Sequence, residues 1–243
     1  MIEDVKDKFS QLKMKTCADN IEQVIDISSE KNWNVLQILD HLLELEIEMK
    51  NKNRVERLFK ESKLSEKITI DQFNFNFHKS RKKYKSLILN LLGLEFVKQK
   101  QNIILIGNLG TGKTFLAKTI AFAATQAGIK VLFTTAANMI NHLIAAESDN
   151  SLLKKLRYYQ SPDILVCDEI GYLPLGTQGS NLFFQIISER HEKKSTMITT
   201  NLPFSNWGNI FDSTTIATAI ADRLVCKSNI LIMEGESYRK RMK

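Results

Sequence analysis

The glycine-rich stretch from Gly107 to Thr114 constrains this chain more than any other feature. Its sequence, Gly-Asn-Leu-Gly-Thr-Gly-Lys-Thr, satisfies the phosphate-binding P-loop pattern G-x-x-x-x-G-K-[ST] at every fixed position. A continuous apolar run over 102–106 precedes the stretch and predicts a buried parallel strand. Apolar residues at helical spacing follow over 113–126 and predict a helix. Because a working P-loop joins a strand to a helix N-terminus, this context favours a nucleotide site over a glycine-rich turn without a ligand.

The residue types of the loop predict how it would hold a nucleotide. Its glycines allow successive backbone N–H groups to point at one anion, and the helix N-terminus adds the positive end of its dipole. We expect Lys113 to reach the β- and γ-phosphates and the Thr114 hydroxyl to bind Mg²⁺. The predicted nucleotide-binding residues are Gly107, Asn108, Leu109, Gly110, Thr111, Gly112, Lys113 and Thr114.

Two acidic residues follow another apolar run and supply the second half of the predicted site. Residues 164–167 predict a buried strand, and Asp168 and Glu169 come at its carboxyl end, where α/β sheets bind ligands. We expect Asp168 to hold Mg²⁺ through water and Glu169 to polarise the attacking water. An acidic pair alone is weakly specific, but downstream of a P-loop it predicts phosphoryl transfer to water.

Three further polar residues are candidates for the same site. Asn201 ends the next apolar run, where a side chain can orient the attacking water, although a turn residue before Pro203 is the alternative. Arg223 and Arg239 are candidates for phosphate contacts, and for each the alternative is an ordinary surface arginine.

The order of the predicted elements indicates a three-layer α/β fold with a parallel sheet. Helical patterns separate five apolar runs that predict strands, at 102–106, 130–135, 163–169, 196–201 and 230–233. Helix spacing dominates the first part of the chain, which has no Gly or Pro before Gly93. We therefore expect a small all-helical domain over 1–70 and an α/β domain over 71–243.

The formal net charge of +7 is unevenly distributed along the chain. Residues 1–49 contain 5 Lys and Arg against 11 Asp and Glu, whereas residues 50–100 contain 14 against 5. A basic segment beside a nucleotide site suggests a polyanion partner such as nucleic acid, and a solvated helical surface is an equally good alternative. The predicted DNA contacts are Arg54, Arg57, Arg81, Lys82 and Lys83.

The sequence also bears on membrane insertion and on export. No apolar run approaches the roughly 18–20 residues that span a bilayer, and the N-terminus lacks the regions of a secretory signal. Cys17, Cys167 and Cys226 have no metal-ligand spacing and are expected to be reduced thiols. We therefore expect a cytoplasmic protein without a membrane partner.

Several separated strings resemble one family. They are Asp-Glu-Ile-Gly-Tyr-Leu-Pro-Leu at 168–175, Thr-Asn-Leu-Pro-Phe-Ser-Asn-Trp-Gly at 200–208, Asp-Arg-Leu at 222–224 and Gly-Glu-Ser-Tyr-Arg at 235–239. These strings resemble the IstB-like ATPases, the transposition helper proteins of insertion sequences, across most of residues 35–243. The resemblance implies an AAA+ ATPase that uses ATP and Mg²⁺ and is related to DnaC-type helicase loaders.

The resemblance also implies roles for single residues and for the whole protein. Asn201 corresponds to sensor 1, Arg223 to the arginine finger and Arg239 to the sensor 2 arginine. The N-terminal helices would engage DNA and assist assembly, and the short segment 234–243 leaves no room for a full helical lid. The implied function is an ATP-dependent helper that forms a homo-oligomer on double-stranded DNA and regulates or recruits a partner transposase.

Three other functions compete with this one. A replicative helicase loader would use the same ATPase core, but the strings at 172–175 and 202–207 favour the IstB-like proteins. A small-molecule P-loop kinase would not need Glu169, because its substrate replaces the water. A scaffold that binds nucleotide without hydrolysis is disfavoured by the intact Lys113, Thr114, Asp168 and Glu169.

Overall fold

The computed structural model of the protein describes residues 1–238, which form two compact units. The first unit is Met1–Arg57, and the second begins at Leu58. The division lies earlier than residue 70, where the sequence pattern placed it. The reason is that Leu64 and Ile68 are buried, and that Leu64 packs into the core of the second unit. The segment after Arg57 therefore belongs to the α/β unit.

The first unit is all-helical. It contains α1 (Ile2–Gln11), α2 (Lys15–Lys31) and the start of α3 (Val35–Glu61). Cys17 and Val24 from α2 pack against Leu42 from α3 in a small apolar core. A carboxylate is buried beside this core: Glu46 accepts a hydrogen bond from the Cys17 N–H at 3.1 Å.

The second unit is built on a five-stranded sheet in which every paired strand is parallel to its neighbour. The strand order is β2-β3-β4-β1-β5. The five strands are β1 (Asn102–Gly107), β2 (Val131–Thr135), β3 (Ile164–Ile170), β4 (Ser195–Thr200) and β5 (Ser228–Met233). All five coincide with the apolar runs that predicted them, and the α/β fold class is confirmed.

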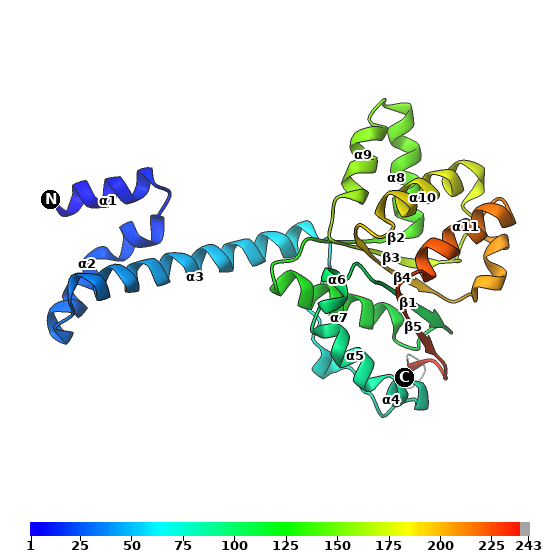
Figure 1. The fold of residues 1–243 in the computed structure, drawn as a ribbon, viewed down its shortest axis with the longest axis horizontal. Coiled ribbons are helices and arrows are strands. Elements are labelled where there is room, and N and C mark those ends of the chain that lie inside the picture. Colours follow the sequence, from blue (N-terminus) through cyan, green and yellow to red (C-terminus); the bar gives the residue numbers. More distant parts are fainter. Residues whose placement is uncertain (239–243) are drawn as a thin grey trace. The chain divides into compact units, whose positions relative to one another are not determined.

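Helices cover both faces of this sheet and complete three layers (Figure 1). Side chains alternate along β1: Ile103 and Leu105 point into the core with α7, whereas Ile104 points into the core with α8, α10 and α11. The helical elements are η1 (Ile70–Gln72), α4 (Lys79–Lys83), α5 (Lys85–Leu92), α6 (Glu95–Lys98), α7 (Lys113–Gln126), α8 (Ala136–Ser148), α9 (Leu152–Gln160), α10 (Gly176–Arg190), η2 (Phe204–Asn209) and α11 (Thr214–Val225).

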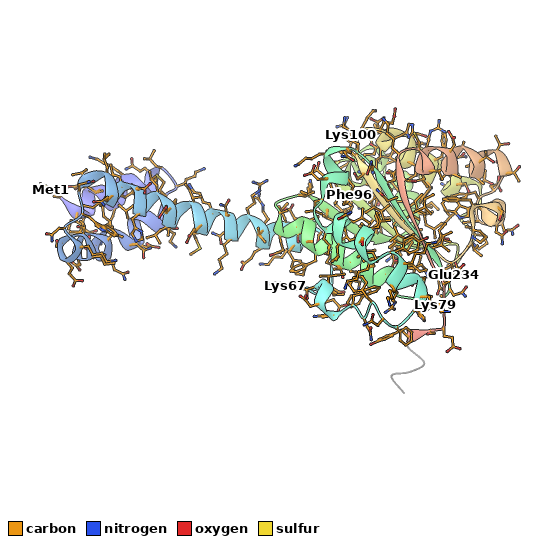
Figure 2. The ribbon with its side chains drawn as sticks, turned by 60° about the horizontal axis from the view of Figure 1, so that its bottom comes forward. Met1, Lys67, Lys79, Phe96, Lys100 and Glu234 are labelled. Carbon is orange, nitrogen blue, oxygen red and sulfur yellow. The ribbon has the colours of Figure 1, made fainter. Side chains whose placement is uncertain are left out.

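The parallel strands give the sheet two chemically different edges. Lys100, just before β1, and Glu234, just after β5, lie at opposite ends of the strands (Figure 2). We call these the amino edge and the carboxyl edge. Ser80 donates a hydrogen bond to the Glu234 carbonyl oxygen at 2.6 Å, so α4 lies at the carboxyl edge.

Residues 1–238 contain neither a helix that could cross a membrane nor an α-helix after β5. In this part of the chain no helix combines the length and the apolar character that crossing a bilayer requires. No α-helix occurs between the end of β5 and residue 238.

Candidate nucleotide-binding site

The P-loop lies at the carboxyl edge, between the end of β1 and the start of α7. Gly112 has a φ of 101°, in the left-handed region that a side chain rarely adopts. A Cβ on Gly112 would lie 2.7 Å from Arg81 Nη2, and a Cβ on Gly107 would lie 2.0 Å from the Met233 carbonyl oxygen. The glycines therefore serve both the bend of the loop and the close approach of its neighbours.

The lysine of the loop is held within the loop. Lys113 is 8% exposed, and its Nζ donates to the carbonyl oxygens of Gly107 at 2.6 Å and Asn108 at 2.8 Å. An ammonium held at this position is close to any phosphate that the loop N–H groups bind. The loop therefore positions its charge before a ligand arrives.

The P-loop and the acidic strand end meet through one hydrogen bond. Thr114 Oγ1 donates to Asp168 Oδ1 at 3.0 Å, and the Asp168 side chain is buried. Hydroxyl and carboxylate oxygens are the ligands that Mg²⁺ prefers. The donor set therefore fits the ion that these two residues were predicted to hold.

Thr199 is a member of this site that the sequence analysis missed. Its hydroxyl donates to Asp168 Oδ1 and accepts from the Glu169 N–H at 2.9 Å. One β4 side chain thus fixes both acidic residues at the end of β3. The available signal was a hydroxyl side chain near the end of a predicted strand, two positions before the candidate Asn201.

Glu169 leaves the regular strand geometry. The β3–β4 pairing shifts register between Cys167 and Ile170, and Glu169 has a φ of 62°. Such a bulge redirects a side chain, and left-handed backbone at a non-glycine residue is strained. The Glu169 side chain is exposed and lines the cavity next to the P-loop.

The cavity beside the P-loop has a volume of about 300 Å³. Asn201 lines it, and its buried Oδ1 has no hydrogen-bond partner within residues 1–238. An unsatisfied buried acceptor is costly unless a ligand or water completes it. Another part of the wall comes from the segment before the sheet, through Gln72, Phe73 and Asn74, which the sequence analysis did not assign to the site.

Arg81 is also part of this wall. It is 3% exposed, and its Nε and Nη2 donate to the Thr111 carbonyl oxygen at 3.1 and 2.8 Å, while Nη1 donates to the Asn74 carbonyl oxygen at 3.0 Å. The guanidinium lies 4.4 Å from the Phe73 ring centroid, and burial lowers the pKa of Arg81. The expected DNA contact does not fit this position, because the guanidinium is enclosed and its donors hold the P-loop.

The sequence matches the family described as IstB-like ATP binding protein over residues 7–243. This chain belongs to that family. Among curated relatives, an ATP-binding protein of insertion sequence IS5376 from Geobacillus stearothermophilus is 36% identical over 243 residues, covering 100% of this chain and 96% of the relative. One of insertion sequence IS21 from Pseudomonas aeruginosa is 35% identical, covering 97% and 88%. One of insertion sequence IS232 from Bacillus thuringiensis is 33% identical, covering 94% and 90%.

Solved structures share the α/β fold of this IstB-like chain. The crystal structure of the DnaC helicase loader matches with a TM-score of 0.61 at 20% identity, covering 68% of this chain and 96% of that one. AMPPCP-bound DnaA from Aquifex aeolicus matches with a TM-score of 0.59 at 16% identity, covering 72% and 53%. At these identities the likeness shows the fold alone, and it agrees with the predicted α/β core with a parallel sheet.

The arginine that the IstB-like resemblance assigned as the finger lies far from its own cavity. The Arg223 carbonyl oxygen accepts from His191 Nδ1 at 3.2 Å and from the side chain of Asn102, the first residue of β1. The P-loop follows the last residue of β1, about 17 Å away at ~3.3 Å per residue. The Arg223 guanidinium lies 4.8 Å from the Phe184 ring centroid, and its Nη1 donates a hydrogen bond to the Ala219 carbonyl oxygen. Arg239 lies outside the described residues.

The four remaining DNA candidates are exposed. Arg54 and Arg57 lie on α3 in the first unit, and Lys82 and Lys83 lie on α4 in the second. These four candidates thus belong to different units of the chain, and the burial of Arg81 does not favour a DNA contact.

Proposed function

We propose that this protein hydrolyses ATP and uses the nucleotide cycle to control its assembly on double-stranded DNA, where it regulates or recruits a partner transposase. The observation that carries the proposal is the hydrogen-bonded set of Thr114, Asp168, Thr199 and Glu169 beside an intact P-loop. The curated relatives at 33–36% identity are ATP-binding proteins of insertion sequences, which supports the role in transposition.

The side chains divide the hydrolytic work. Lys113 stabilises negative charge on the β- and γ-phosphates, and Glu169 accepts the proton of the attacking water. Asn201, with its unpartnered Oδ1, orients that water. Thr114 and Asp168 would hold Mg²⁺, which would supply positive charge to the phosphate oxygens. Thr199 holds Asp168 and Glu169 in position for these two roles, because its hydroxyl contacts the Asp168 carboxylate and the Glu169 backbone N–H.

The proposal includes oligomer formation because Arg223 lies at the amino edge of the sheet, whereas the cavity lies at the carboxyl edge. Arg223 therefore cannot complete the cavity of its own subunit. In this proposal a neighbouring subunit supplies Arg223 to that cavity, so hydrolysis depends on oligomer formation. DNA contacts come from Arg54, Arg57, Lys82 and Lys83, with contacts to phosphate rather than to base edges.

The decisive experiment measures ATP turnover with and without duplex DNA and images the DNA-bound particles by electron microscopy. We expect turnover to rise with DNA and oligomers to form on it. Neutralising Lys82 and Lys83 together should weaken binding to all sequences alike and reduce the log–log salt slope by about 0.9 per lost phosphate contact. An unchanged slope would remove α4 from the DNA surface.

A second assay separates the transposition role from the helicase-loader alternative. A transposase from an insertion sequence that carries this gene and the host replicative helicase are each tested for ATP-dependent binding to the protein. Binding to the transposase alone supports the proposal. Binding to the helicase alone overturns it while leaving the ATPase assignment intact.

A further inference from the structure

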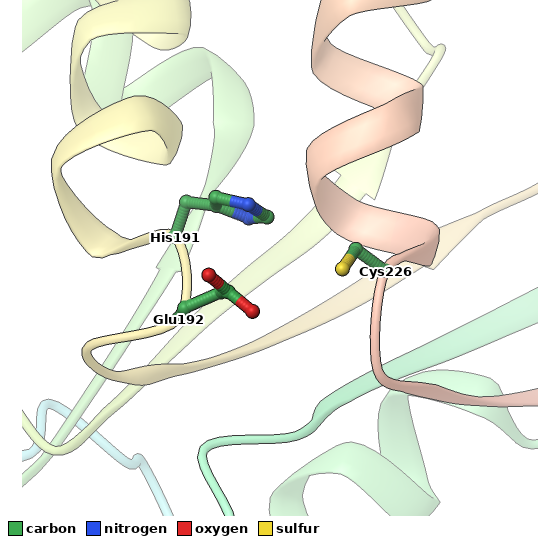
Figure 3. Close-up of side chains that lie close together, drawn as sticks. All are labelled: His191, Glu192 and Cys226. Carbon is green, nitrogen blue, oxygen red and sulfur yellow. The ribbon is translucent and has the colours of Figure 1, made fainter.

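Three side chains with metal-binding chemistry meet at the amino edge of the sheet, away from the nucleotide cavity. They are His191, Glu192 and Cys226, and their ligand atoms all lie within 4.8 Å of one another (Figure 3). His191 is half-buried, whereas Glu192 and Cys226 are exposed. Thirty-odd residues of chain separate the first two from the third, so their spacing gave no signal in the sequence. Nothing in the proposed ATPase cycle uses them.

The three residues follow the C-termini of two helices. His191 comes directly after α10, where its N–H donates to the Ile187 carbonyl oxygen at 2.9 Å, and Cys226 comes directly after α11, where its N–H donates to the Asp222 carbonyl oxygen at 3.0 Å. Figure 3 shows the side chains in the space between these two helix ends. A helix C-terminus carries partial negative charge from its free carbonyl groups. Two such ends close together favour a cation there.

The hydrogen bond of His191 fixes which nitrogen is available to a metal. His191 Nδ1 lies 3.2 Å from the Arg223 carbonyl oxygen, and a carbonyl oxygen can only accept. Nδ1 therefore carries a proton, which leaves Nε2 as the ring nitrogen that can bind a metal. Metal-binding histidines in proteins are commonly oriented in this way, with the other ring N–H donated to a backbone carbonyl or carboxylate.

The backbone on both sides of the cluster is anchored. Arg190, directly before His191, donates from Nη1 to the Pro162 carbonyl oxygen at 2.8 Å and from Nε to Thr196 Oγ1 at 3.1 Å. Burial lowers the pKa of Arg190 to about 10, so it stays charged at neutral pH. Directly after Cys226, the Lys227 carbonyl oxygen accepts from the Asn102 N–H at 3.0 Å. The backbone of both turns is therefore fixed by hydrogen bonds, while the side chains of His191, Glu192 and Cys226 can still rotate.

We propose that His191, Glu192 and Cys226 bind a divalent transition-metal ion of the zinc type. A nitrogen, an oxygen and a sulfur ligand suit Zn²⁺, whose bonds of about 2.0–2.3 Å place tetrahedral ligand atoms roughly 3.4–3.7 Å apart. From a spread within 4.8 Å, small side-chain rotations close the site. The Cys226 thiol loses its proton to solvent as the sulfur–metal bond forms, and a water completes the fourth position. A thiolate ligand disfavours Mg²⁺ and Ca²⁺.

One ion pair in the structure competes with the metal. Lys227 Nζ lies 2.8 Å from Glu192 Oε1, and the hydrogen bond with Lys227 lowers the pKa of Glu192. A metal must share or displace this ammonium. An equivalent exposed pair, Lys193 with Glu189 at 2.7 Å, lies nearby on the chain outside the cluster and offers a matched control.

The site has a consequence for Arg223, which rests on the proposed function. Arg223 lies three residues before Cys226, and its carbonyl oxygen holds His191. A bound metal would join the end of α10 to the end of α11 and stiffen the segment that presents Arg223 to a neighbouring subunit. Metal binding itself does not depend on that role.

The test is a Co²⁺ titration of the full-length protein, because cobalt bound to a thiolate gives a sulfur-to-metal absorption band. Zn²⁺ should displace the cobalt and protect Cys226 from alkylation. Cys226→Ser and His191→Ala should each remove the band, with thermal unfolding in chelator confirming that both variants fold. The buried Cys17 and Cys167 leave Cys226 as the exposed thiol among residues 1–238. A band that is absent from the wild type, or that survives Cys226→Ser, overturns the proposal.

The lysine variants sharpen the result. Lys227→Ala should raise Co²⁺ affinity about two- to fivefold, the change that loss of one competing exposed ion pair supports. Lys193→Ala changes the net charge equally and should leave the affinity unchanged. An equal gain in both variants would mean that overall charge, and not Glu192, governs binding, and would remove Glu192 from the site. ATP turnover with and without Zn²⁺ then tests the link to Arg223 separately, since metal binding can hold while that link fails.

Discussion

Arg81 Nη2 donates to the carbonyl oxygen of Thr111 at 2.8 Å, so a residue that precedes the first strand in the chain supports the P-loop. The same guanidinium fills the space that Gly112 leaves open, with Nη2 2.7 Å from where a Cβ would be. Arg81 belongs to a basic segment of the sequence, but in the structure it positions the P-loop.

Replacement of Arg81 should therefore impair nucleotide binding rather than DNA binding. Arg81→Ala removes three hydrogen bonds from a charged donor and should lower the free energy of unfolding by about 2–4 kcal/mol and weaken ATP binding. Arg81→Lys should recover only part of the affinity, because an ammonium cannot reproduce the paired contacts to Thr111. Denaturation and nucleotide titration measure both effects. Lys82→Ala is the control, since Lys82 is exposed one residue away. Normal ATP affinity with reduced DNA affinity in Arg81→Ala would contradict this account.

Binding and hydrolysis should separate at Lys113 and Glu169. Lys113→Ala removes the cation that faces the phosphates, so useful ATP affinity should be lost. Glu169→Gln keeps the shape of the side chain but cannot accept the proton of water, so ATP should bind normally and turnover should fall. Equilibrium binding and single-turnover rates distinguish the two. Wild-type hydrolysis by Glu169→Gln would disprove the role of Glu169.

Thr199 should affect turnover through the carboxylates that it connects. Thr199→Val keeps the volume but removes one of the two hydroxyl donors to Asp168 and leaves the Glu169 N–H without its acceptor. We expect a turnover loss of about tenfold or more with a smaller change in ATP affinity, as for a lost hydrogen bond to a charged group. Thr200→Val is a control on the same strand, because that hydroxyl contacts Leu202 instead. Similar losses in both variants would point to general strand damage.

Arg223 should act on the neighbouring subunit. Arg223→Ala should bind ATP nearly normally and hydrolyse it poorly, since arginine fingers in other nucleotidases contribute on the order of 10³–10⁵ in rate. Mixing Arg223→Ala with Lys113→Ala should restore part of the activity, because each variant supplies what the other lacks. Arg239→Ala should gain nothing from the same mixture. Inactive mixtures in which the variants demonstrably co-assemble would exclude the arrangement.

The buried Glu46 should make the N-terminal unit sensitive to acid. Burial alone raises the pKa of Glu46, but the hydrogen bond from the Cys17 N–H and the ion pair with Lys50 outweigh it, so the net pKa is lowered. A lowered folded-state pKa contributes stability above the unfolded value of about 4.3 and loses it as the pH falls through the folded value. Denaturant unfolding between pH 7 and pH 3 should show this loss. Glu46→Gln should be less stable at pH 7 and should show a shallower decline.

The amino-acid sequence alone determined the features that consecutive residues encode. The P-loop, the acidic strand end and the alternation of strands and helices are local patterns, because glycine conformations, apolar runs and helix spacing act within a few residues. They sufficed to predict the α/β fold, and the nucleotide-site roles of Lys113, Thr114, Asp168 and Glu169 stay predictions. The domain boundary depended on burial of Leu64 and Ile68, which the helical pattern over the same region did not reveal.

Only the tertiary structure decided which distant residues share a site. The strand order sets β4 between β3 and β1, and this brings Thr199 to Asp168 and Asp168 to Thr114. Arg81 looks like its exposed neighbours Lys82 and Lys83 in sequence, yet the turn of the chain encloses it against Thr111. His191 and Cys226 become neighbours because two helices end at the same edge of the sheet. A charge or a thiol has the same chemistry in any sequence, and its role depends on the segments that fold against it.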